Sequence, residues 1–384
     1  MSKVAISTGV LRWALDRSRK SAEDLEARFP KIGQWLEGVA VPTLRQLEAL
    51  AQVTMTPLGL LFLDEPPIEK LPIPHFRTLK DDIVDRPSPD LLETMQSMQR
   101  RQAWMREFLI EEGQTPLPFV RSARVGERPP IVAQRVRDAL GLSNDWASRE
   151  RTWTDALVRL REAMEEAGIL VVANGVVGNN THRKLDPAEF RGFVLVDEYA
   201  PLVFVNGSDG KAAQMFTLAH ELAHVFFGSS AAFDLRQMMP AQDDTELACN
   251  QLAAEFLVPE DLLRKSWPSA RDNEEPFQLL AQRFKVSEIV VARRALDLHL
   301  IDKRAFLEFY QAYREDESRR ANQPSGGDFY ANQNVKVGRR FGSTVVRAVR
   351  EAKLLYSEAY ALTGLYGTTF DKFATSLADR GARP

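Results

Sequence analysis

The sequence contains a single cysteine, Cys249, among its 384 residues, which excludes an intramolecular disulfide framework and favours a reducing compartment. No apolar run approaches the ~20 residues that a membrane-spanning helix needs, and residues 1–20 lack the apolar segment of a secretory signal peptide. A large excess of one charge is also missing. The formal net charge is −3, which does not by itself indicate a nucleic-acid-binding protein. We therefore expect a cytoplasmic protein that has no membrane partner.

Changes in composition divide the chain into four predicted segments, since a chain of 384 residues has room for more than one domain. The first is a domain of short helices at 1–63, and the second is a proline-rich arm with a connecting helix at 64–130. A globular unit follows at 131–316, and a small helical domain occupies 328–384. The expected fold class is α+β, predominantly helical, with a small β-sheet in the globular unit.

The globular unit contains three stretches with the composition of strands. GILVVANGVV is rich in β-branched residues, which favours a buried strand. The segments 193–196 and 202–205 indicate a strand pair joined by a turn at 197–200. A helix is predicted over 211–227 and ends at Gly228. The other helices predicted in this unit span 131–140, 152–167, 243–257, 260–266, 276–284, 287–298 and 302–316.

The predicted helix at 211–227 carries HELAH at 220–224, which matches the H-E-x-x-H pattern. Side chains four residues apart lie on one helix face, so the imidazoles of His220 and His224 can bind one metal ion. Glu221 lies about 100° around the helix from His220, where it can act as general base toward a zinc-activated water molecule. The alternative is a pair of histidines that share a helix face by chance and bind no metal.

A catalytic zinc ion needs a third protein ligand, and a carboxylate must supply it because no further histidine follows closely in the sequence. The segment DDTELACNQLAAEFLVP offers Glu246 and Glu255, which lie about 180° apart around a helix. Only one of them can therefore face the metal. Helix geometry favours Glu246, because Asn250 lies one turn further on the same face and can fix a histidine ligand from the second coordination sphere.

Three blocks of this unit resemble the ImmA/IrrE family of zinc metallopeptidases. They are FRGFVLVDEYAPLVFVN, FTLAHELAH and ELACNQLAAEFLVP, in this order along the chain, and the resemblance covers roughly residues 130–300. It implies a zincin-like peptidase core that holds Zn²⁺ through His220, His224 and Glu246, with Glu221 as the catalytic base. It also implies a protein substrate, since family members typically cleave a DNA-binding repressor.

The N-terminal segment resembles the XRE-type helix-turn-helix domain of longer family members, on the residues IGQWLEG and VPTLRQLEALAQVTMTPLGLLF. The net charge of this segment gives only weak support for DNA binding. Residues 1–63 contain eight basic and six acidic side chains, and the expected recognition segment offers Lys31 and Gln34 for contacts with DNA. This segment therefore either binds DNA sequence-specifically or serves as a domain that holds substrate or packs on the peptidase.

The C-terminal segment also resembles the tail of longer family members, and it is more basic. Residues 319–384 contain eleven basic and five acidic side chains. Five basic residues fall on one face of a helical wheel: Lys336, Arg339, Arg340, Arg347 and Arg350. The opposite face is apolar: Val337, Phe341, Val345, Ala348 and Ala352. The basic face is either a binding surface for DNA, RNA or an acidic partner or an ordinary solvated helix face.

Together these patterns predict a Zn²⁺-dependent endopeptidase that cleaves a protein substrate, and the resemblance implies a transcriptional regulator as that substrate. The alternative is a DNA-binding regulator or an antitoxin that pairs with a toxin, in which the zinc site is structural or vestigial. The two hypotheses differ in whether the carboxylate of Glu221 is needed for function.

Overall fold

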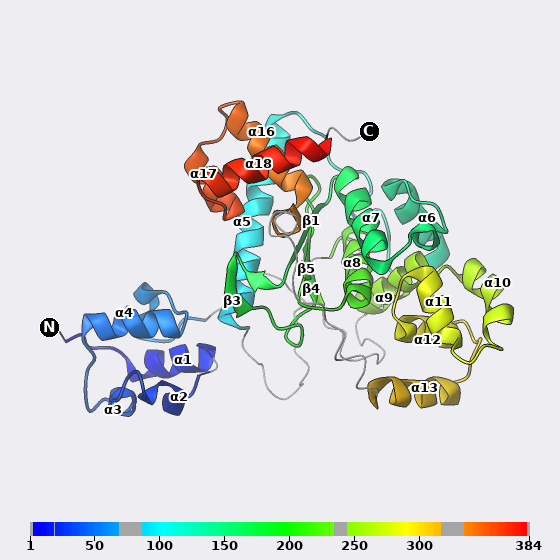
Figure 1. The fold of residues 1–384 in the computed structure, drawn as a ribbon. Helices are drawn as coiled ribbons and strands as arrows, with labels where there is room; N and C mark the ends of the chain where they lie inside the picture. The colour runs from blue at the N-terminus through cyan, green and yellow to red at the C-terminus, as the bar shows by residue number, and fades with distance from the viewer. Residues whose placement is uncertain are drawn as a thin grey trace. The chain divides into compact units, whose positions relative to one another are not determined.

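The structure is a computed structural model that describes residues 3–18, 20–68, 87–229, 231–233, 244–315 and 334–381. The fold is α+β and predominantly helical, as predicted (Figure 1). The chain forms two compact units, which divide within the long helix α5 (Pro89–Glu111) between Gln96 and Ser97. Most of the predicted proline-rich arm lies outside the described residues. Among the described residues, no helix combines the length and apolar character needed to cross a membrane.

The first unit is built from short helices and the start of α5. The helices are α1 (Thr8–Ser18), α2 (Ala22–Glu26), α3 (Ile32–Leu36), α4 (Leu44–Val53) and the 3-10 helix η1 (Leu58–Phe62). Two of them begin with a capping box, in which Ser21 pairs with Asp24 and Thr43 with Gln46, so backbone N–H groups at these helix starts are satisfied. An apolar core holds the helices together: Leu11, Leu15, Leu25, Phe29, Ile32, Trp35 and Leu50.

The second unit contains a four-stranded sheet. Its strands, in spatial order, are β1 (Leu170–Asn174), β5 (Leu202–Asn206), β4 (Gly192–Leu195) and β6 (Ala231–Phe233). β4 and β5 form the predicted antiparallel pair, with Phe193 opposite Phe204. β1 joins β5 in parallel, and β6 pairs antiparallel with the other edge of β4. The sequence predicts neither of these pairings, because the composition of a strand does not specify its partner. A separate hairpin joins β2 (Val176–Val177) and β3 (Asn180–Lys184).

Helices cover one face of this sheet. α7 (Trp153–Glu166) packs on β1, and α8 (Lys211–Phe227) packs on β4 and β5. Figure 1 shows both helices on the same side of the sheet. α9 (Asp244–Leu257) lies against α8 and against α6 (Pro129–Leu140). The remaining helices of this region are η2 (Trp146–Arg149), α10 (Glu260–Ala270), α11 (Pro276–Phe284), α12 (Glu288–Asp297) and α13 (Lys303–Glu315).

The second unit also includes three helices near the C-terminal end of the described residues: α16 (Arg339–Arg350), α17 (Tyr356–Thr363) and α18 (Thr368–Gly381). The guanidinium group of Arg101, which is buried on α5, donates to the backbone carbonyls of Leu362 (2.9 Å) and Lys336 (3.1 Å). Burial lowers the pKa of Arg101 to about 10, so this group stays charged at neutral pH. Carbonyls at the ends of helical turns carry partial negative charge, which stabilises the buried cation.

The predicted basic face is interrupted. Gly338, with φ of 85°, separates the helical turn that carries Lys336 from α16. Arg340 is half-buried, and its guanidinium donates to the backbone carbonyl of Glu165 (3.3 Å) while its backbone N–H donates to the Glu165 carboxylate (3.0 Å). The exposed members of the face are Arg339, Arg347 and Arg350. A helical wheel places residues on one continuous helix, which the glycine prevents.

The predicted apolar face packs inward, except at its end. Val337, Phe341, Val345 and Ala348 are buried. Ala352 is exposed, because α16 ends at Arg350 and Ala352 has a φ of 56°, outside the helical range. The prediction for Ala352 is therefore wrong.

Replacing Arg101 with Met removes the buried donors and keeps a flexible apolar chain. The carbonyls of Leu362 and Lys336 then lose a partner, so we expect the free energy of unfolding to fall by about 2–4 kcal/mol. Chemical unfolding followed by tryptophan fluorescence measures the change. Arg100→Met alters an exposed neighbour on α5 and should change stability by less than about 0.5 kcal/mol. Equal stability of the two variants would contradict the docking role of Arg101.

Candidate metal and catalytic site

Helix α8 places two histidines and a glutamate in the core. His220 and Glu221 are 0 % exposed and His224 is 1 % exposed. The helix ends where Gly228 adopts the left-handed conformation, with φ of 82°, which glycine takes without steric strain. A side chain at this position would also overlap Arg121. The helix therefore ends at the predicted residue, and both the left-handed φ and the contact with Arg121 require glycine there.

The two imidazoles meet a carboxylate from α9. The Nε2 atoms of His220 and His224 lie 3.0 Å apart. The carboxylate oxygens of Glu246 lie 3.2 Å from Nε2 of His220 and 3.3 Å from Nε2 of His224. One ligand atom from each residue thus lies within 4.8 Å of the others. Two histidines and one glutamate are a ligand set typical of catalytic zinc sites.

The second ring nitrogen of each histidine also has a partner. Nδ1 of His220 lies 3.1 Å from Oδ1 of Asn250, and Nδ1 of His224 lies 2.8 Å from Oγ of Ser229. An amide oxygen can only accept, so neutral His220 carries its proton on Nδ1 and presents a lone pair on Nε2. The spacing of Asn250 from Glu246 predicts a contact of this kind. The sequence does not predict the Ser229 contact, because Ser229 lies beyond the motif and outside the helix.

The charges of this cluster favour a cation. Burial lowers the pKa of His220 to about 4, so its imidazole is neutral at pH 7. Burial acts to raise the pKa of Glu246, but the close contacts of its carboxylate with the imidazoles of His220 and His224 outweigh burial and hold that pKa below its ordinary value. A nitrogen lone pair and an ionised carboxylate oxygen therefore lie 3.2 Å apart, and a bound cation stabilises such a pair. The residues present fit a zinc ion.

Glu221 lies next to this ligand set with neither carboxylate oxygen hydrogen-bonded to a described residue. Burial raises the pKa of Glu221 well above its ordinary value, and the charge of Glu246 adds to the rise. Strand β4 passes close by: a Cβ atom at Gly192 would lie 3.2 Å from Oε1 of Glu221 and 2.6 Å from Cγ2 of Thr217. A buried carboxylate without partners is unfavourable by itself, so we expect water or substrate to complete its contacts.

The second carboxylate that the sequence offers, Glu255, lies at a different place on α9. It forms a buried ion pair with Arg294 of α12. Arg137 of α6 donates to the backbone carbonyl of Glu255 at 2.8 Å. These contacts join three helices, so the structure places Glu255 in helix packing and Glu246 at the histidines.

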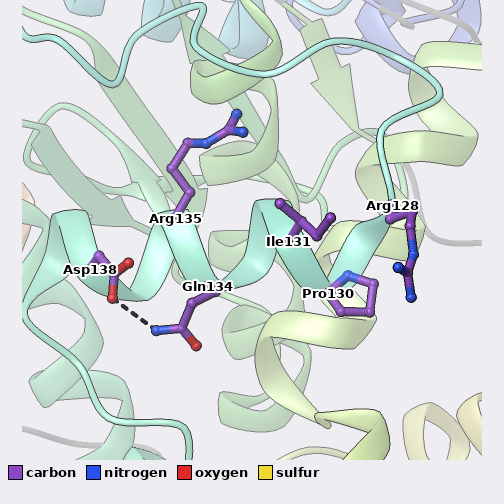
Figure 2. A pocket seen from close by; sticks show the side chains of 6 residues that line it. All are labelled: Arg128, Pro130, Ile131, Gln134, Arg135 and Asp138. Carbon is purple, nitrogen blue, oxygen red and sulfur yellow. Dashed lines mark hydrogen bonds between the residues drawn. The ribbon is translucent and has the colours of Figure 1, made fainter.

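A separate hollow of about 520 Å³ lies on α6, and Figure 2 shows Arg128 and Pro130 at the start of that helix. Its lining residues are Arg128, Pro130, Ile131, Gln134, Arg135 and Asp138. Arg135 is paired with Glu127 (3.0 Å), and Gln134 donates to Asp138 (2.8 Å). None of the lining residues belongs to the histidine and glutamate cluster, so the hollow is a different feature of the surface.

Residues 164–296 match the family model of the IrrE N-terminal-like domain, Peptidase M78. The predicted resemblance to the ImmA/IrrE family is confirmed for this range, and the match supports a metallopeptidase. The IrrE-like domain contains all of the four-stranded sheet, α8 and α9, and with them the whole candidate site.

Residues 337–376 match a second family model, a domain of unknown function (DUF8813). This range covers α16, α17 and most of α18. No curated protein matches the chain. The IrrE-like domain therefore carries the assignment, and the C-terminal helices form a second recognisable module.

We expect the purified chain to hold about one zinc ion through the IrrE-like domain. His220→Ala removes one ligand and should lose the metal. Mass-spectrometric metal analysis after gel filtration measures the zinc content. His299→Ala, at an exposed histidine, is the control and should keep it. Wild-type protein that takes up no zinc on reconstitution would contradict the metal site.

Replacing each of the two glutamates of α9, Glu246 and Glu255, should have opposite effects on zinc content and on stability. Glu246→Gln should lose zinc with little effect on the stability of the metal-free protein. Glu255→Gln should keep zinc but lower the free energy of unfolding by about 3 kcal/mol, because Arg294 loses its charge partner while it stays buried. Metal analysis and chemical unfolding of both variants test this. Loss of zinc from the Glu255 variant at unchanged stability would reverse the assignment.

Proposed function

We propose that the chain is a zinc-dependent endopeptidase that cleaves a protein substrate. One observation carries the proposal: Nε2 of His220, Nε2 of His224 and the carboxylate of Glu246 converge beside Glu221, whose buried carboxylate has no partner among the described residues. The match of the IrrE-like domain to a peptidase family supports the same activity.

In this proposal His220, His224 and Glu246 hold Zn²⁺, which when bound polarises a substrate carbonyl and lowers the pKa of a water molecule toward ~7. Glu221 accepts a proton from the attacking water at a carboxylate oxygen and releases it to the departing amide nitrogen. Asn250 accepts a hydrogen bond from Nδ1 of His220, which keeps Nε2 of that ring turned toward the ligand set.

The substrate proposed from the family resemblance is a transcriptional regulator. Peptidases of this general kind bind an extended substrate segment as an added strand at a sheet edge. β4 passes beside Glu221 at Gly192, and its outer edge is already paired with β6. A substrate strand would therefore add to β6 or take its place.

A second candidate function is a DNA-binding regulator or an antitoxin with a toxin partner. The three arginines exposed on α16 favour it, since a basic helix face can contact phosphates. The N-terminal unit favours it less, because Glu23, Asp24 and Glu26 are exposed on α2 and repel a phosphate backbone. In this function the carboxylate of Glu221 has no chemical role.

The Glu221→Gln variant separates the two functions. It keeps the metal ligands but removes the proton acceptor, so we expect unchanged zinc content and a ~10²–10⁴-fold lower cleavage rate. Zinc-loaded protein is incubated with a mixed peptide library, and the products are read by mass spectrometry. Glu274→Gln, at an exposed glutamate, should cleave as the wild type does. Identical product patterns from Glu221→Gln and wild type would reject catalysis and leave the regulator or antitoxin function.

A further inference from the structure

The end of helix α8 brings Ser229 back onto the histidine that precedes it by five residues. The backbone N–H groups of Gly228 and Ser229 both point to the carbonyl oxygen of His224, at 2.8 Å and 3.2 Å. In the same turn, Oγ of Ser229 lies 2.8 Å from Nδ1 of the His224 ring. The backbone and the side chain of Ser229 thus both contact His224.

This contact bears on which ring nitrogen faces the metal ligands. Nε2 of His224 lies 3.0 Å from Nε2 of His220 and 3.3 Å from Glu246. An imidazole binds a metal through one nitrogen, and a hydrogen bond at the other nitrogen fixes both the tautomer and the orientation of the ring. A hydroxyl group that accepts from Nδ1 of His224 therefore leaves a lone pair on Nε2.

The two histidines are held from different directions. Asn250, which contacts Nδ1 of His220, is carried by α9, the helix that also carries Glu246. Ser229 comes two residues after the end of α8, so the turn at Gly228 sets its position. Gly228 is needed there because its φ of 82° is strained for other residues and because a side chain would overlap Arg121. The serine is therefore held in place by the same turn that ends the helix.

We propose that Ser229 is a positioning residue of the metal site: its hydroxyl accepts the Nδ1 hydrogen of His224 and holds Nε2 toward His220 and Glu246. The inference rests on the proposed zinc site, and it adds a residue that the sequence motif does not contain. A serine that only ends the helix would act on the stability of the fold and not on the affinity for the metal.

A matched pair of variants tests the hydroxyl itself. Ser229→Thr and Ser229→Val have side chains of nearly the same shape, but only the threonine keeps a hydroxyl group. The zinc dissociation constant of each full-length protein is measured by titration against a chromophoric chelator. Thermal unfolding of the metal-free proteins reports any effect on folding. Ser269→Ala is the control, since Oγ of Ser269 bonds to a backbone carbonyl near the end of α10.

We expect Ser229→Val to weaken zinc binding about 10–100-fold, Ser229→Thr to stay within a few-fold of wild type, and Ser269→Ala to match it. The metal-free melting temperatures of the Thr and Val variants should agree. Equal zinc affinities for the Thr and Val variants would overturn the inference and leave the zinc site intact. Lower melting temperatures with equal affinities would assign Ser229 to helix capping alone. Wild-type protein without measurable zinc affinity would overturn both the inference and the proposed function.

Discussion

The close approach of two imidazole nitrogens and a carboxylate inside the core is the constraint on which the candidate site depends. Nε2 of His220 and of His224 lie 3.0 Å apart, and the oxygens of Glu246 lie 3.2 Å and 3.3 Å from them. Three electron-rich groups so close together are unfavourable unless a cation joins them and the surrounding structure holds them. Asn250 and Ser229 hold the two rings at their other nitrogens.

The packing of the sheet against α8 brings a strand next to the catalytic candidate, Glu221. β4 can approach α8 closely because Gly192 has no side chain to overlap Thr217, and this brings the sheet next to Glu221. Gln102 of α5 braces the turn between β4 and β5 by donating to the carbonyls of Leu195 (2.7 Å) and Ala200 (2.9 Å). The neighbouring Arg101 holds the C-terminal helices. One helix therefore supports both the IrrE-like domain and the second matched module.

Short sequence patterns predict much of this site. The features that they do not predict are contacts between segments that are far apart in the chain. The bounds of α8 follow from an apolar run and a glycine that can turn left-handed, both readable in the sequence. The opposite directions of Glu246 and Glu255 on one helix allow only one of them at the metal, and the spacing to Asn250 together with the family resemblance selects Glu246. Two features could not be predicted: the parallel pairing of β1 with β5, and the hydrogen bonds from Arg101 to the C-terminal segment. Each joins segments that are far apart in the chain, and the residues next to either segment do not indicate which partner it meets. The structure leaves only part of the predicted basic face exposed, because Gly338 separates Lys336 from α16 and the contacts with Glu165 half-bury Arg340.

The central claim is that these side chains form one zinc centre, and X-ray absorption at the zinc edge of the reconstituted protein tests it most directly. The structure predicts two imidazole nitrogens and light oxygen ligands at about 2.0–2.2 Å, with no sulfur in the first shell. A zinc–sulfur distance near ~2.3 Å, which would require Cys249, or a shell without imidazole scattering would contradict the account.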